Sequence, residues 1–197
     1  MSRTYSDLQL DALREVANIG SGRAGTALAQ MLGRAVDLTV PTVLALPLGE
    51  AVEAVGDPES EVTAVAIPIF GEMDAVVVLL FAPSAAATLC ELLGVEPGSD
   101  VGRSALQEIG NILGTSYVGA IEEMTALRLE PRPPHLTTDM LGAIVSTVLA
   151  EVSGASELAL VLDSSLQVEG HPCSLSFVLV PERDGVGHLL SRLGLAT

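Results

Sequence analysis

The first apolar pattern in the chain has the period of an α-helix. Ser6 and Gln9 have the spacing of a capping box, which favours a helix start at Asp7. Apolar residues then recur at roughly helical spacing, at Leu8, Leu13, Val16, Ile19, Ala24, Ala27, Leu28, Met31 and Leu32. Gly33 follows, and glycine is typical of the end of a helix. The pattern therefore predicts one long helix from Asp7 to about Leu32.

The rest of the first half predicts a succession of short elements. In order, these are a strand at Val36–Val40 that ends at Pro41, a helix at Leu48–Val55, a hairpin of Val62–Ile69 and Ala75–Phe81 around Gly71–Asp74, and a helix from Pro83 to near Gly94. Pro97, Gly98 and Ser99 then predict a loop.

The second half repeats this order. Its expected elements are a helix capped by Ser99 or Asp100 that carries Leu106, Ile109, Ile112 and Leu113, a strand at Leu127–Glu130, a helix from Asp139 to about Val152, strands at Leu158–Leu162 and Ser174–Val180 around the turn Glu169–Pro172, and a helix from Pro181 to near Gly194. Two matching sets of elements indicate an internal duplication.

These elements predict an α+β fold built from a pseudo-two-fold duplicated unit. We expect about six strands in one mainly antiparallel sheet, flanked by about six helices. Each half would be small for a stable core of its own. We therefore expect one domain over residues 1–197, made of the repeated halves 1–98 and 99–197.

Composition and charge exclude several classes of function. Hydrophobic residues make up 49% of the chain and charged residues 17%, which is typical of a globular protein. The net charge is −16, and the nine basic residues are all arginine, so nucleic-acid binding is not expected. The longest apolar run, Ala75–Cys90, contains Pro83 and is shorter than the ~20 residues of a membrane-spanning helix.

The cysteines and histidines show no pattern of a metal or redox site. Cys90 and Cys173 form no CxxC pair, and no apolar signal region opens the chain, so we expect reduced thiols and a cytoplasmic protein. His135, His171 and His188 are scattered without metal-ligand spacing. These five residues are expected to pack or to face solvent, and the chain is expected to bind no cofactor.

One polar motif occurs twice at identical spacing. Its two copies are Asp11, Glu15, Asn18 and Pro41, and Ser104, Glu108, Asn111 and Pro134. In both, three residues separate the first motif residue from the Glu, two separate the Glu from the Asn, and twenty-two separate the Asn from the Pro. Asn18 and Asn111 are the only asparagines in the chain. A single copy would be read as solvated surface residues, but the repeat favours a functional site.

On a helix, the first three motif residues lie within about 60° of arc, so each half presents a carboxylate beside a neutral amide. No histidine, activated nucleophile or metal cluster accompanies them, and a pair of glycosidase carboxylates on opposite halves would be too far apart. An amide can orient a water beside a phosphoryl group without adding negative charge. The glutamates are better suited to pairing with a cation on a phosphorylated partner.

The motif resembles that of the CheC family of chemotaxis phosphatases, related to CheX and to the phosphatase part of FliY. Both copies match the family pattern [Asp/Ser]-x3-Glu-x2-Asn-x22-Pro without departure, and the resemblance covers the whole chain. It implies dephosphorylation of the response regulator CheY. By that resemblance, Asn18 and Asn111 orient the attacking water, Glu15 and Glu108 contact the regulator's lysine, and the regulator supplies Mg²⁺. Asp11 and Ser104 match motif positions of less certain role, and Pro41 and Pro134 are expected to be structural.

The resemblance also bears on partners and assembly. CheX-like proteins carry one motif and pair up, whereas two intact motifs favour CheC and, we expect, a monomer. Many CheC proteins bind the deamidase CheD, for which the helix expected from Asp139 to Val152 is a candidate surface.

Two alternatives stay open. One is a non-catalytic adaptor that binds CheY, CheD or the flagellar switch, and the other is a small-molecule hydrolase with an enclosed apolar pocket away from both asparagines. We also expect unequal sites, the second at least as active, because Asp11 adds negative charge to the first.

Overall fold

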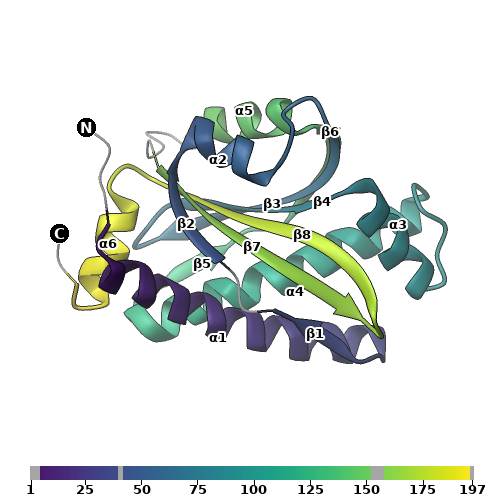
Figure 1. Cartoon of the computed structure of the whole chain (residues 1–197), viewed down its shortest axis with the longest axis horizontal. Helices are drawn as coiled ribbons and strands as arrows, with labels where there is room; N and C mark the ends of the chain where they lie inside the picture. Colours follow the sequence, from purple (N-terminus) through teal and green to yellow (C-terminus); the bar gives the residue numbers. More distant parts are fainter. Residues whose placement is uncertain (1–4, 40–41, 152–157, 196–197) are drawn as a thin grey trace.

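The computed structural model describes residues 5–39, 42–151 and 158–195, which form six helices and eight strands (Figure 1). The first half contains α1 (Asp7–Leu32), β1 (Val36–Leu38), β2 (Thr42–Pro47), α2 (Leu48–Val55), β3 (Glu61–Gly71), β4 (Ala75–Phe81) and α3 (Pro83–Leu92). The second half contains α4 (Asp100–Thr125), β5 (Leu129–Pro131), β6 (His135–Met140), α5 (Leu141–Glu151), β7 (Leu158–Val168), β8 (His171–Pro181) and α6 (Gly185–Arg192). α4, β5, β6 and α5 each begin 93 residues after α1, β1, β2 and α2.

Both long helices begin where the sequence predicts, and α1 also ends there. Ser6 caps α1 by accepting a hydrogen bond from the amide of Gln9, whose side chain accepts one from the Ser6 amide in return. Gly33 ends α1 in the left-handed region, with φ of 62°. The side chain of Ser99 caps α4 in the same way, 3.0 Å from the amide of Gly102. Both predicted helix starts are confirmed.

The eight strands form one antiparallel sheet, and the two halves exchange strands within it. The order is β1-β7-β8-β4-β3-β5, with β2 also paired to β7 and β6 also paired to β3. The short strands of each half therefore pair with the long hairpin of the other half. The hairpins meet at the centre, where Val78 of β4 lies opposite Val178 of β8. The predicted fold class is confirmed.

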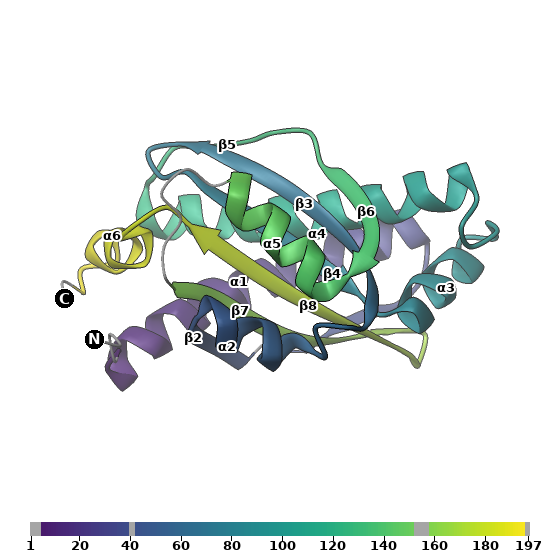
Figure 2. The same ribbon diagram turned by 90° about the horizontal axis from the view of Figure 1, so that it is seen from above.

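Helices cover both faces of this sheet (Figures 1 and 2). One face packs against α1, α4, α3 and α6, and the other against the shorter α2 and α5. All seven residues of β4 are buried, and they alternate between the two cores: Val77 and Leu79 face the α1–α4 side, whereas Val78 and Leu80 face the α2–α5 side. A continuous apolar strand is the pattern expected of a strand covered on both faces.

The expected number of strands was wrong, because the sequence did not reveal β2 and β6. β2 is a continuous apolar run between prolines, which does not alternate as a half-buried strand does. β6 is largely exposed and polar, and it pairs with β3 from Glu61 opposite Met140 to Ala66 opposite His135. Its place in the sheet depends on backbone pairing that a hydrophobic pattern does not report. Val40 and Pro41, the expected end of the first strand, lie outside the described residues.

The helix expected from Asp139 also starts later than predicted. Asp139 belongs to β6, where it lies opposite Val62, and α5 begins at Leu141. The amides of Leu141 and Gly142 donate to the carbonyl oxygens of Ser60 and Pro58, at 2.9 Å each. These backbone acceptors satisfy the first turn, so a side-chain cap is not required there. The predicted end at Val152 lies outside the described residues.

The helices α1 and α4 pack directly against each other and run in opposite directions (Figure 1). A Cβ added to Gly20 would lie 2.4 Å from Cδ1 of Tyr117, so only a glycine allows the ring this close. The Tyr117 hydroxyl is 2.8 Å from the buried Ser21 hydroxyl. At the surface, Arg23 of α1 forms an ion pair with Glu123 of α4.

A glutamate at the tip of each hairpin holds the end of the other half's long helix. The Glu72 amide donates to the carbonyl of Arg128, and the Glu169 amide donates to the equivalent carbonyl of Ala35, at 3.0 Å in both cases. The Glu169 carboxylate also pairs with Arg34. Each long helix is thus tied to a strand connection of the opposite half.

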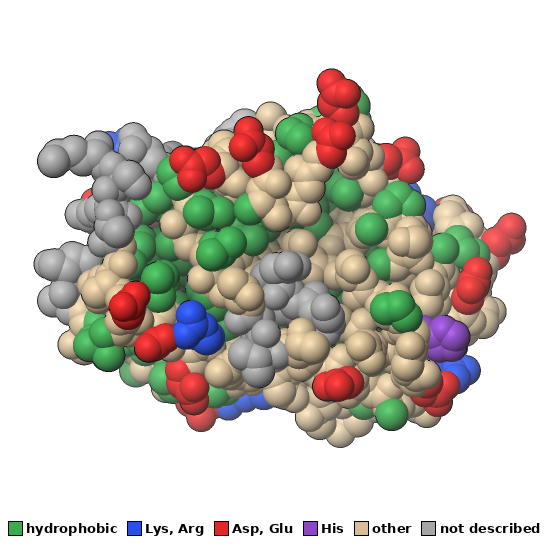
Figure 3. All heavy atoms as spheres, viewed as in Figure 1, with side chains coloured by type: hydrophobic (Ala, Val, Ile, Leu, Met, Phe, Trp, Pro, Cys, Tyr) green, Lys and Arg blue, Asp and Glu red, His purple; other side chains and the backbone are tan. Residues whose placement is uncertain are grey.

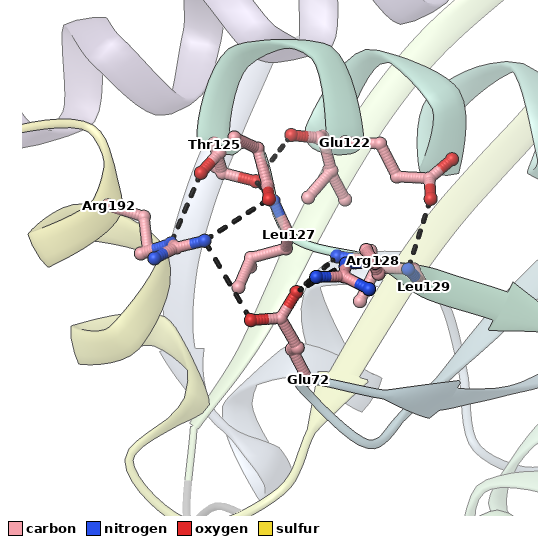
Figure 4. A network of polar contacts seen from close by, with 9 residues as sticks. Glu72, Glu122, Thr125, Leu127, Arg128, Leu129 and Arg192 are labelled. Atoms are coloured by element: carbon pink, nitrogen blue, oxygen red, sulfur yellow. Dashed lines mark hydrogen bonds and ion pairs between the residues drawn. The ribbon is translucent and has the colours of Figure 1, made fainter.

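The end of α4 is held further by a small polar network (Figure 4). The Glu72 carboxylate accepts from the Arg128 amide at 2.9 Å and lies 3.9 Å from the Arg192 guanidinium. Arg192 of α6 donates to the carbonyls of Thr125 and Ala126, at 3.2 and 3.1 Å. A cation at the last carbonyls of a helix satisfies free acceptors and complements its dipole.

None of the helices in the described ranges has the length and apolar character needed to cross a membrane. The chain is acidic, with a net charge of −16. On the face seen in Figure 3, acidic side chains are spread among apolar and polar ones, and basic side chains are few. That face offers no basic stripe of the kind that binds nucleic acid.

Glycines in the two long helices differ in what surrounds them, which gives a paired stability test. A Cβ at Gly110 would lie 2.6 Å from Cβ of Val65, so Gly110→Ala is expected to destabilise the fold by about 1–3 kcal/mol through overpacking. Gly22 has open space around it, so Gly22→Ala is expected to stabilise by about 0.5–1 kcal/mol. Urea unfolding of both variants measures the difference. Equal stability of Gly110→Ala and the wild type would contradict this packing.

Candidate functional site

The first motif copy forms an exposed ridge on α1. Asp11 and Glu15 are exposed and Asn18 is half-buried, while the intervening Leu13 and Val16 are buried against the core. This is the face that a spacing of four and then three residues selects on a helix. Glu15 and Asn18 therefore share one face of α1, as the sequence predicts.

The second copy repeats this arrangement on α4. Ser104 and Glu108 are exposed, and Asn111 is half-buried. Nδ2 of Asn111 lies 3.5 Å from Oε2 of Glu108, at the outer limit of a hydrogen bond. Glu108 and Asn111 are thus brought together as a pair, and the amide is oriented toward the carboxylate.

The motif proline of the second copy is tied to its helix by a residue that the sequence reasoning missed. Nε2 of Gln107 donates to the carbonyl oxygen of Pro134 at 2.7 Å, in a part-buried position. This bond fixes the stretch before β6 against α4, one residue away from Glu108. No signal in the chain alone could have found Gln107, because the equivalent position in the first copy is Arg14.

The surroundings of the first motif copy differ from those of the second. Arg14 forms an ion pair with Asp11, the acidic residue that opens the motif. Pro41 lies outside the described residues. Oδ1 of Asn18 is buried without a hydrogen-bond partner among the described residues. A buried acceptor left unsatisfied is destabilising by about 1–3 kcal/mol.

The two sites are well separated along the antiparallel helices. Glu15 precedes Gly20 by five residues, and Glu108 precedes Tyr117 by nine, on opposite sides of the Gly20–Tyr117 contact. At 1.5 Å per residue, the two glutamates lie about 21 Å apart along the helix axes. A glycosidase pair needs carboxylates within about 10 Å, so the two glutamates do not form one.

The described residues offer neither a metal site nor an activated cysteine for other kinds of hydrolysis. No three His, Cys, Asp or Glu side chains of that part gather as a metal site would require. Cys90 and Cys173 are free and buried, and burial raises the pKa of both thiols above the usual range. A raised pKa reduces the thiolate fraction, so neither cysteine is suited to act as a nucleophile.

The cavities of the described part do not favour a small-molecule hydrolase. Two apolar cavities, one in each core, measure about 30 and 20 Å³, which is room for a water molecule and not for a substrate. An open groove of about 630 Å³ lies between α1 and β1, and small and polar residues line it. Asp37 is the only acidic or basic residue along it, and no motif residue takes part.

Comparisons with known proteins agree with the motif. Residues 8–44 and 101–137 each match the CheC-like family. The chain is 34% identical to the CheY-P phosphatase CheC of Bacillus subtilis, over 94% of each protein. Its fold matches the crystal structure of FliY from Thermotoga maritima with a TM-score of 0.76 at 20% identity, over 98% of both chains.

A more distant match is CheX in a complex with CheY, BeF3 and Mg from Borrelia burgdorferi. The TM-score is 0.51 at 13% identity, over 88% of this chain and 99% of that one, which is a likeness of fold. The identity to the Bacillus protein over nearly the full length, together with the two matched stretches, establishes the relationship. The chain belongs to the CheC-like family.

Proposed function

We propose that this protein is a phosphatase that hydrolyses the aspartyl phosphate of the response regulator CheY. The observation that carries the proposal is the duplicated Glu–Asn ridge, with Glu15 and Asn18 on α1 and Glu108 and Asn111 on α4. The name of the Bacillus relative, a CheY-P phosphatase, supports the choice of substrate.

Each asparagine acts on water. The amide of Asn18 or Asn111 enters the active site of the regulator and accepts a hydrogen bond from a water molecule. This bond orients the water so that the water oxygen faces phosphorus. The water oxygen forms a bond to phosphorus while the bond from phosphorus to the aspartyl oxygen breaks, which leaves a free aspartate carboxylate. Both hydrogens of the water leave with inorganic phosphate. A carboxylate in place of the amide would repel the phosphoryl oxygens.

The partner completes the site. Glu15 and Glu108, both exposed, pair with the regulator's lysine and fix the approach of the amide. The Mg²⁺ ion that neutralises the phosphoryl group is held by the regulator. This division of parts matches the ridge, which offers a carboxylate and an amide and no nucleophile of its own.

The two sites are proposed to differ in activity, with the second at least as active. At the second site, Asn111 lies 3.5 Å from Glu108, and the Gln107–Pro134 bond holds the stretch before β6 against α4. We expect these contacts to restrict the position of the amide before the partner binds. Such preorganisation lowers the barrier, because less freedom is lost on reaching the transition state. At the first site, Arg14 is engaged with Asp11 instead.

An adaptor that binds CheY without hydrolysing it is the main alternative. An adaptor would have use for the exposed glutamates but not for an amide at the same place in both halves. The first experiment below separates the two, because an adaptor would leave the lifetime of phosphorylated CheY unchanged.

Removing both amides tests the catalytic assignment. The double variant Asn18→Ala with Asn111→Ala is expected to lose the acceleration of CheY-P decay by about 100-fold or more, the usual effect of deleting a preorganised polar group. Gln30→Ala, which removes an exposed amide of α1 outside the motif, should retain full activity. Phosphate release at saturating phosphorylated CheY provides the measurement. Full activity in the double variant, or no acceleration by the wild type, would rule the proposal out.

Gln107 tests the difference between the sites. In an Asn18→Ala background, where the second site alone works, Gln107→Ala is expected to lower kcat about 5- to 10-fold, the equivalent of one lost hydrogen bond. In an Asn111→Ala background the same change should leave kcat unaltered, since Gln107 contacts the second site. Equal effects in both backgrounds would indicate a general loss of structure and contradict the positioning role.

A further inference from the structure

An exposed apolar residue stands at the start of each motif helix. Leu8 of α1 is 65% exposed and Val101 of α4 is 63% exposed. They are the two most exposed large hydrophobic side chains among the described residues. Single exposed leucines are common on protein surfaces, but these two occupy the same position, 93 residues apart.

Both residues lie on the motif ridge. Leu8 precedes Asp11 by three residues and Asn18 by ten, and Val101 has the same spacing to Ser104 and Asn111. On a helix, Leu8, Asp11, Glu15 and Asn18 fall within about 80° of arc and span about 15 Å. Each ridge therefore runs in order from an apolar residue through the carboxylate to the amide.

Neither side chain takes part in the N-terminal cap of its helix. The cap of α1 uses Ser6 and Gln9, and the cap of α4 uses Ser99 and the amide of Gly102. With about two thirds of its surface in solvent, neither Leu8 nor Val101 contributes much to the cores. The matches to the family begin at these two residues, at 8 and at 101.

Resting on the proposed function, we propose that Leu8 and Val101 are apolar anchors for the phosphorylated regulator. Each packs against an apolar patch on the regulator surface beside its phosphorylation site, about three helical turns from the asparagine that enters it. One regulator molecule occupies one ridge, and the anchor decides how firmly it is held. Leu8 and Val101 are binding residues and do not touch the reacting atoms.

Charge explains why an apolar anchor is useful here. The chain carries a net charge of −16, and the ridge itself adds Asp11 and Glu15 to the approach of a phosphorylated site. Burial of an apolar side chain is independent of the sign of the partner's charge and is not screened by salt. The anchor therefore supplies attraction at the place where the surface charge supplies little.

The test is the double variant Leu8→Ser with Val101→Ser. The expected result is a KM for phosphorylated CheY raised about 10-fold with kcat unchanged, because an interaction made equally in the ground and transition states affects KM alone. The conservative pair Leu8→Met with Val101→Ile should restore the wild-type KM. Met140→Ser is the matched control, since Met140 is 52% exposed but lies on β6, outside both ridges.

Direct binding separates this inference from the proposed function. Binding of beryllofluoride-activated CheY with Mg²⁺ should weaken about 10-fold in the serine variant. If the wild type is inactive, the proposed phosphatase function is wrong. If the wild type is active but the serine variant keeps the wild-type KM and affinity, only the anchoring role of Leu8 and Val101 is wrong. A change in self-association without a change in CheY binding would overturn them too, by assigning the surface to a second copy of the chain. Urea unfolding verifies the fold, and the pair Leu8→Gln with Val101→Gln replaces the serines if they unfold.

Discussion

The exchange of strands between the halves is the constraint on which the rest of the structure depends. β1 and β2 complete the sheet beside β7, and β5 and β6 complete it beside β3, so the hairpin of each half is flanked by short strands from the other half. The connection from each long helix into the sheet therefore leads to the opposite hairpin. The glutamates at the hairpin tips, Glu72 and Glu169, bind there as well. The orientation of α1 relative to α4, and with it that of the two ridges, follows from this pairing.

The start of each long helix and the central hairpins could be predicted because their causes are local, whereas the last helix, expected from Pro181, begins at Gly185 and Pro181 belongs to β8. The Ser6–Gln9 box, Gly33 and the apolar run of β4 each act within a few residues of the chain. β2 and β6 could not be found in this way, since they are held by backbone pairing with strands far along the sequence. Asp139 was misplaced for a related reason: the acceptors for the first turn of α5 are the carbonyls of Pro58 and Ser60, about eighty residues earlier.

The residues of the candidate site also divide into those with a local signal in the sequence and those that depend on distant parts of the chain. Glu15, Asn18, Glu108 and Asn111 were identifiable because a repeated spacing and a scarce residue type are visible in one sequence. Gln107 was not, because its role depends on a carbonyl brought alongside by the fold, and the other copy carries Arg14 at that place. Duplicated halves thus share the ridge while differing in what steadies it. The two copies differ both in the residue that opens the motif, Asp11 or Ser104, and in the residue next to the motif glutamate, Arg14 or Gln107.

The glycines under the ridges have a mechanical consequence. Gly110 rests on Val65 and Gly20 on Tyr117, so backbone meets side chain there with no flexible atom between them. Contacts of this kind have little compressibility, and they lie beside Asn111 and close to Asn18. Local openings of a fold start at frayed ends and loosely packed loops. Asn18 and Asn111 therefore lie in closely packed stretches of their helices, where a local opening of the fold is not expected to begin.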